Sequence, residues 1–140
     1  MNVSDNMPLS GIKAVLIDDS NTIRRSGEIF LTQAGCHVVL AEDGFDGLSK
    51  IVELRPDVIF VDIMMPRLDG YQTCALIRNN GEFKTTPVIM LTSKDSLFDR
   101  AQGKLVGSDL FLIKPFSKKS MVDAAIKYTQ GKQGGSSNAH

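Results

Sequence analysis

The sequence predicts an α/β protein in which a doubly wound, five-stranded parallel sheet carries helices on both faces. Five short apolar runs, rich in β-branched residues, are separated by segments with apolar residues at helical spacing. Such runs are typical of parallel strands that are buried on both faces. Strict alternation of strand and helix is typical of a three-layer, doubly wound sheet.

The five predicted strands are short and almost wholly apolar. Pro87 begins one of them, at a position where the sheet needs no backbone donor. The strands are the run AVLI after Lys13 and residues 37–41, 57–62, 87–92 and 109–113.

The predicted helices occupy the segments between the strands and after the last one. Ser20 is suited to cap the first helix, which ends at Gly35, and Arg55-Pro56 stops the second. Gly70 begins the third, and the fourth, weaker helix ends at Gly107. The residues that mark them are Ile23, Gly27, Phe30, Leu31 and Ala34; Leu48, Ile51 and Val52; the inward-facing Cys74, Ala75 and Ile77; Leu97, Ala101 and Leu105; and Met121, Val122, Ala125 and Ile126, with Thr129 close to the end.

The 140 residues suit one domain. Sixteen basic and sixteen acidic residues give no net charge, which argues against nucleic-acid or membrane binding. No apolar run approaches the roughly 20 residues of a membrane span. Two cysteines without a CxxC pair argue against a zinc ribbon or a disulfide-stapled secreted domain. We expect a cytoplasmic monomer with a flexible arm over residues 1–11, a folded domain over 12–129 and a flexible tail over 130–140.

Polar side chains follow four of the five predicted strands. Asp18 and Asp19 follow the first, Asp62 ends the third, Thr92 ends the fourth and Lys114 follows the fifth. Ligands of doubly wound sheets bind at this carboxyl edge. Three carboxylates crowded there would repel one another, and Mg²⁺ together with the Lys114 ammonium would relieve that repulsion.

A carboxylate can also act as a nucleophile toward phosphorus and form an acyl phosphate. Asp62 is the best candidate, because it stands alone at the end of a central strand, before a loop that leaves room for a donor. Mg²⁺ and Lys114 would neutralise charge on the phosphoryl oxygens, and the Thr92 hydroxyl would donate to them. Singly, each residue has an ordinary reading: a turn or cap aspartate, an N-cap threonine, or a Lys114-Pro115 turn with a cis proline. Their joint placement favours the functional reading.

These residues resemble the receiver domain of bacterial two-component response regulators over residues 12–129. The matching segments are LIDDS (16–20), VDIMMPRLDG (61–70), MLTS (90–93) and IKPF (113–116). The resemblance implies a flavodoxin-like (CheY-like) fold with strand order 2-1-3-4-5.

The same resemblance assigns roles at the site. It implies phosphorylation of Asp62 and Mg²⁺ binding, with Mn²⁺ as a substitute, by Asp18, Asp19, Asp62 and the Met64 backbone carbonyl. Thr92 and Lys114 would bind the phosphoryl group, and Thr92 and Phe111 would form the conformational switch.

Residues 60–80 and 86–99 resemble the regulators of type IV pilus twitching motility more specifically. This resemblance implies phosphorylation by a chemosensory-type histidine kinase and binding to a pilus motor or signalling protein. Only a tail follows residue 129, without a DNA-recognition helix, so we expect output by protein binding through the fourth helix, fifth strand and fifth helix, and no DNA or membrane partner.

Four alternatives are weighed against this reading. One is a chemotaxis-type regulator of another motility system. A second is a small aspartyl phosphotransferase, which would normally carry a second aspartate as general acid where this chain has Met64. A flavodoxin-type carrier would need a phosphate-binding loop where Asp18 and Asp19 stand. A scaffold that is never phosphorylated would not need the acidic pair, Asp62 and Lys114.

Overall fold

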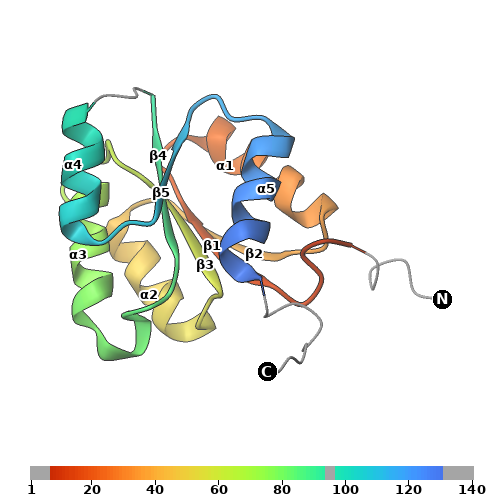
Figure 1. Cartoon of the computed structure of the whole chain (residues 1–140), viewed down its shortest axis with the longest axis horizontal. Helices are drawn as coiled ribbons and strands as arrows, with labels where there is room; N and C mark the ends of the chain where they lie inside the picture. Colours follow the sequence, from red (N-terminus) through yellow and green to blue (C-terminus); the bar gives the residue numbers. More distant parts are fainter. Residues whose placement is uncertain (1–6, 94–96, 131–140) are drawn as a thin grey trace.

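The structure is a computed structural model that describes residues 7–93 and 97–130. Its five parallel strands form one sheet in the order β2-β1-β3-β4-β5, as predicted. Five α-helices and a short 3-10 helix connect and cover the strands (Figure 1). The sequence did not predict the 3-10 helix. The strands are β1 (Lys13–Ile17), β2 (His37–Ala41), β3 (Val58–Asp62), β4 (Val88–Thr92) and β5 (Leu110–Ile113). The helices are α1 (Asn21–Gln33), α2 (Gly44–Leu54), α3 (Gly70–Asn79), η2 (Gly81–Phe83), α4 (Leu97–Val106) and α5 (Lys118–Thr129).

The helices bury the two faces of the sheet in two separate cores. Helices α1 and α5 cover one face, and α2, α3 and α4 cover the other (Figure 1). Alternate residues of each strand enter opposite cores: Phe60 of β3 packs with α1 and α5, whereas Ile59 and Val61 pack on the other side. This two-sided burial explains why the strands are apolar throughout rather than alternating.

Side chains at the helix starts fix where the chain leaves the sheet. Ser20 caps α1, as predicted, by accepting a hydrogen bond from the Ile23 backbone N–H. Asp69 caps α3 and Ser117 caps α5, and each forms a reciprocal capping box. Because these helices start just after the carboxyl ends of strands, the caps also order the loops at that edge of the sheet.

The expected N-terminal arm and C-terminal tail lie partly outside the described residues. Residues 1–6 of the expected arm and residues 131–140 of the expected tail are not described. The described part of the arm belongs to the packed body, because Leu9 is fully buried and its backbone N–H donates to the Ala34 carbonyl at 2.8 Å. Leu9 therefore contributes to the α1–α5 core, and ordered structure begins before residue 12.

One expectation about which helix residues face inward was wrong. In α3, Cys74 and Ile77 are buried, but Ala75 is only half-buried and Thr73 takes the inner position. In α4, Ala101 is exposed and Leu105 has 81% of its surface exposed, whereas Gly103 is buried. The spacing of apolar residues located α4 correctly, although two of the residues that marked it are exposed. Among the described side chains of α4, the half-buried Val106 packs against the core.

Candidate functional site

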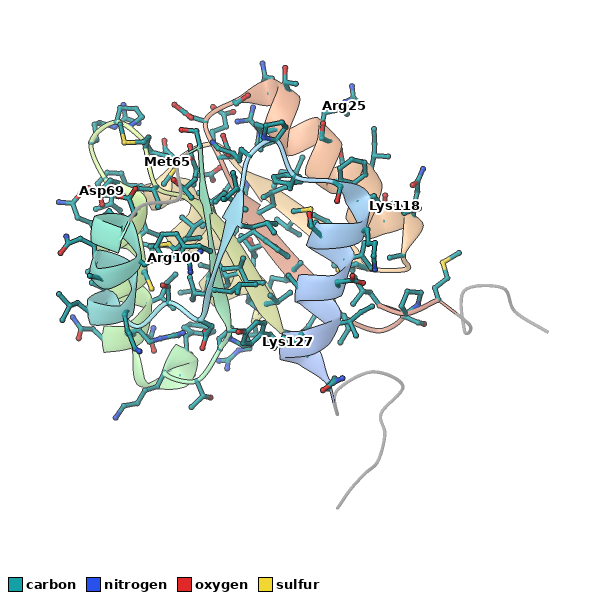
Figure 2. All side chains as sticks on the ribbon, turned by 45° about the horizontal axis from the view of Figure 1, so that its top comes forward. Arg25, Met65, Asp69, Arg100, Lys118 and Lys127 are labelled. Carbon is teal, nitrogen blue, oxygen red and sulfur yellow. The ribbon has the colours of Figure 1, made fainter. Side chains whose placement is uncertain are left out.

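The predicted site residues do come together at the carboxyl edge of the sheet. Asp18 follows β1, Asp62 ends β3, Thr92 ends β4 and Lys114 follows β5. The parallel register holds these ends level, since Ile17 pairs with Val61, and Thr92 pairs with Ile113. The loop from β3 to α3, marked by Met65 and Asp69 in Figure 2, lies at this edge.

Three carboxylates form an acidic cluster at the centre of the edge. Asp18 and Asp62 are buried, with 0% and 2% of their surface exposed, whereas Asp19 is exposed. One carboxylate oxygen from each of the three lies within 4.8 Å of the others, a spacing at which one cation could contact all three. Such hard oxygen donors, open to solvent on one side, suit Mg²⁺, which usually retains several waters. The described residues therefore fit the metal that the sequence predicts.

Lys114 supplies the cation that holds the buried carboxylates together. Its Nζ donates to Asp62 Oδ1 at 2.9 Å and to Asp18 Oδ2 at 3.3 Å. The Lys114–Pro115 peptide bond is cis, which was one of the possibilities considered from the sequence. Burial lowers the pKa of Lys114, but the hydrogen bond to Asp62 and the charges of Asp18 and Asp62 outweigh it and raise the pKa above its usual value. Lys114 therefore stays charged.

Asp62 is electrostatically unlike an ordinary surface aspartate. Burial raises the pKa of its carboxyl from 3.8 to about 6, and the neighbouring charges of Asp18 and Asp19 push in the same direction. The hydrogen bond and positive charge of Lys114 oppose this shift without cancelling it. Near neutral pH Asp62 is therefore mainly ionised, but its negative charge is poorly compensated.

The β1–α1 loop fixes Asp18, the buried one of the two aspartates that precede α1. The Ser20 backbone N–H donates to Asp18 Oδ1 at 2.9 Å, and Arg24 donates from Nη1 to the Asp18 carbonyl oxygen at 2.5 Å. A second Arg24 nitrogen donates to Asn21 Oδ1. The sequence did not predict this role of Arg24, because nothing in the local pattern distinguishes an exposed helix arginine from one that folds back onto a loop.

Gly70 allows α3 to begin directly behind Asp62. A Cβ at position 70 would overlap the Asp62 carbonyl oxygen and lie 2.7 Å from Ile63 Cα. The Gly70 backbone N–H donates to the Ile63 carbonyl at 2.9 Å, which closes the β3–α3 loop. The sequence indicated a helix start here, but the close approach to the Asp62 backbone becomes visible only in the structure.

A small pocket opens beside the acidic cluster. It has a volume of about 180 Å³ and is lined by Ile63, Met64, Thr92, Ser93 and Asp99. Met64 contributes an exposed side chain, and Thr92 is buried at the end of β4. Asp99 on α4 accepts a hydrogen bond from the Tyr71 hydroxyl of α3 at 2.9 Å. This bond links α3 to α4 at the side of the pocket.

The Phe111 side chain lies farther along the same face of the sheet. It is half-buried and packs against the core formed by α2, α3 and α4. Phe111 pairs with Met90 on β4, two residues before Thr92. The structure thus places the two predicted switch residues on neighbouring strands, on the side covered by α4.

A five-stranded parallel sheet with an acidic cluster and a lysine at its carboxyl edge is what the sequence resemblance implied, and comparison with known families supports the same class of protein. The response regulator receiver domain model matches residues 14–126, so the chain belongs to the response regulator receiver domain family. Members of this family are signalling proteins rather than classical enzymes. Among the described residues, no helix has the length and apolar character of a bilayer span.

Among individual proteins, the chain is similar to protein PilG of Pseudomonas aeruginosa. The two are 63% identical over 114 residues, which cover 81% of this chain and 84% of PilG. The probable transcriptional regulator ycf27 of Guillardia theta is 40% identical over 109 residues, but the chain spans only 42% of its length.

Solved structures show the same fold. Chemotaxis protein CheY4 of Vibrio cholerae superimposes with a TM-score of 0.81 at 33% identity, covering 84% of this chain and 98% of CheY4. The receiver domain of the Francisella response regulator 1452 superimposes with a TM-score of 0.76 at 32% identity, covering 86% of this chain and all of that one.

Proposed function

We propose that the protein is a response regulator that accepts a phosphoryl group on Asp62 and signals through protein binding that depends on this modification. The observation that carries the proposal is the pairing of a buried, poorly compensated Asp62 carboxylate with Lys114 inside an acidic cluster. An acyl phosphate forms when an Asp62 oxygen attacks phosphorus and the donor's leaving group departs. The arrangement favours this reaction, because the attacking group is ionised near neutral pH and Lys114 holds it in place.

Other groups at the edge would stabilise the transferring phosphoryl group. Asp18 and Asp19, together with Asp62 and the Met64 backbone carbonyl, would bind Mg²⁺, which neutralises charge on the phosphoryl oxygens when it is bound. Lys114 would move from Asp62 onto one phosphoryl oxygen. The Thr92 hydroxyl would donate to another, since Thr92 lines the pocket beside Asp62.

The experiment is phosphorylation of the purified protein by acetyl phosphate, read by intact-protein mass spectrometry. We expect one phosphoryl group on the wild type with Mg²⁺ present, and none on Asp62→Asn. Asp123→Asn is the matched control, because Asp123 is an exposed α5 carboxylate whose ion-pair partner is Lys119. A phosphorylated Asp62→Asn protein would show that another residue is the acceptor.

We further propose a pathway: a chemosensory-type histidine kinase donates the phosphoryl group in the cytoplasm, and the regulator then acts on the type IV pilus. The 63% identity to PilG supports a pilus role over a role in another motility system, because the chemotaxis protein CheY4 is only 33% identical. In a strain whose only copy is Asp62→Ala, we expect loss of twitching. Normal twitching in that strain would contradict control through phosphorylation.

A further inference from the structure

Gly103 lies in the last part of α4, and the ring of Phe111 occupies the space that a side chain at this position would fill. A Cβ built on Gly103 would overlap Phe111 Cε1 and lie 2.5 Å from Phe111 Cζ and 2.7 Å from Ser108 Oγ. The tip of the aromatic ring therefore sits where every other amino acid would place its first side-chain carbon. Gly103 is buried, whereas Leu105 on the same helix is exposed.

The backbone does not explain this glycine. Gly107, four residues on, has a φ of +90° and needs glycine for its left-handed conformation, whereas Gly103 is an ordinary helical residue. Glycine within a helix is destabilising relative to alanine, because it loses more conformational freedom on folding. The close contacts with the Phe111 ring, and to a lesser degree with the Ser108 hydroxyl, are the features of this position that require glycine.

The end of α4 is anchored, so it cannot readily retreat from a larger residue at position 103. Ser108 N–H donates to the Gly103 carbonyl at 2.9 Å and Gly107 N–H to the Lys104 carbonyl at 3.1 Å, the pattern of a Schellman motif. Arg78 Nε then holds the Gly107 carbonyl at 2.9 Å. Of the two partners in the contact, the Phe111 ring, which turns about its own side-chain bonds, is the one free to move.

We propose that Gly103 is a positioning residue of the switch: it forms a slot that holds the Phe111 ring against α4 in the unphosphorylated protein. This inference rests on the proposed function, in which phosphorylation draws Thr92 toward the phosphoryl group. Thr92 and Phe111 lie on neighbouring strands, so space vacated by Thr92 opens on the face that carries the ring. The slot thus stabilises the resting conformation. It also sets how much of the unphosphorylated protein already adopts the conformation that phosphorylation favours.

Linkage gives the direction of the effect. Gly103→Ala fills the slot and destabilises the conformation in which the ring occupies it; the contact with the Ser108 hydroxyl is the same whether or not the ring is there. A ligand that favours the other conformation then binds more tightly, because less of its binding energy is used to shift the equilibrium. We expect Gly103→Ala to bind the phosphoryl mimic beryllofluoride, in the presence of Mg²⁺, about fivefold or more tightly than wild type.

A double substitution separates this role from a purely structural one. In a Phe111→Ala background there is no ring to displace, so adding Gly103→Ala should leave beryllofluoride affinity unchanged. Gly81→Ala is the matched control, since a Cβ there meets nothing within 4 Å. Equal beryllofluoride affinity in wild type and Gly103→Ala, or the same gain with and without the Phe111 ring, would overturn the proposal.

Wild-type protein provides a second test that needs no variant to fold. Nuclear Overhauser contacts between the Phe111 ring protons and Gly103 Hα should be present with Mg²⁺ alone and lost at saturating beryllofluoride. Contacts that persist after beryllofluoride binds would overturn the role of Gly103 and leave the proposed function intact. Failure of wild type to bind beryllofluoride would instead overturn the proposed function, and the switch role with it.

Discussion

Asp62 combines burial with incomplete charge compensation, and this has a measurable effect on stability. Its pKa is raised from 3.8 to about 6 in the folded protein, so between these values the folded state binds more protons than the unfolded state. Stability from this residue is therefore greatest below about pH 4 and is lost as pH rises through about 6. The loss is on the order of 1–3 kcal/mol without Mg²⁺.

The substitution Asp62→Asn removes this titration while keeping the shape of the side chain. Without Mg²⁺, we expect the variant to be at least as stable as wild type at pH 7, and its advantage to shrink as pH falls toward 4. Urea denaturation of both proteins across this range provides the measurement. An advantage that grows on acidification would contradict the raised pKa of Asp62.

Arg67 shows how the loop after Asp62 uses an unusual backbone conformation. Its φ is +68°, in the left-handed region, and its side chain forms an exposed ion pair with Asp43 at 3.0 Å. Asparagine tolerates this conformation, whereas a β-branched residue does not. We expect Arg67→Asn to stay within about 0.5 kcal/mol of wild type, because exposed ion pairs contribute little.

Arg67→Val should lose about 1–2 kcal/mol in the same urea denaturation experiment. Equal stabilities of the asparagine and valine variants would show that the backbone conformation at residue 67 is not held by the fold.

Thr92 at the end of β4 and Phe111 on β5 should differ in how they contribute to the switch. Moving a population from 1:99 to 99:1 takes about 5.5 kcal/mol, but one hydrogen bond to a charged group supplies only about 1.5–3 kcal/mol. Thr92 therefore needs help from Lys114 or a bound partner. Phe111 has no hydroxyl, so its coupling to Thr92 must be steric.

We expect Thr92→Ala to be phosphorylated but to show a reduced structural response, and Phe111→Tyr to respond like wild type. The measurement is the change in backbone amide chemical shifts over α4 and β5 on adding beryllofluoride with Mg²⁺. A full response in Thr92→Ala would contradict the assigned role of its hydroxyl.

At the level of single elements, the sequence located the strands and helices but did not show which face of each helix is buried. Strands end where apolar runs meet Asp18, Asp62 or Lys114, so their ends and the acidic edge could be predicted. The inner faces of α3 and α4 could not, because they depend on what a neighbouring element presents. Gly103 is buried because the Phe111 ring fits against it, a match between two segments that helical periodicity does not record.

In the whole molecule, three carboxylates and one lysine lie at the carboxyl edge of a sheet whose two faces are packed by separate cores. Mg²⁺ that binds only the folded protein stabilises it by RT ln(1 + [Mg²⁺]/Kd), or about 1.4 kcal/mol at ten times Kd. We expect this stabilisation in thermal melts of wild type and Asp123→Asn, and a weaker one in Asp19→Asn. It should also weaken below pH 6, where protonated Asp62 is a poorer ligand. Equal Mg²⁺ effects in wild type and Asp19→Asn would contradict the metal site.

The overall architecture was the most predictable level. Alternation of strand and helix indicated the three layers, and the family motifs implied the strand order that the structure shows. The inclusion of Leu9 in the core was not predictable, because the few apolar residues scattered through this polar segment show no periodicity. The raised pKa of Asp62 needed coordinates as well, since it depends on burial and on charges 44 and 52 residues away in sequence, at Asp18 and Lys114.

Phosphorylation of Asp62 is tested most directly by locating the phosphoryl group on a single residue. Borohydride reduces an aspartyl phosphate to homoserine, which tandem mass spectrometry assigns to one position in a peptide. After treatment with acetyl phosphate and Mg²⁺, we expect homoserine at position 62 and at no other aspartate. Homoserine at Asp18, Asp19 or another position, or at none, would contradict it.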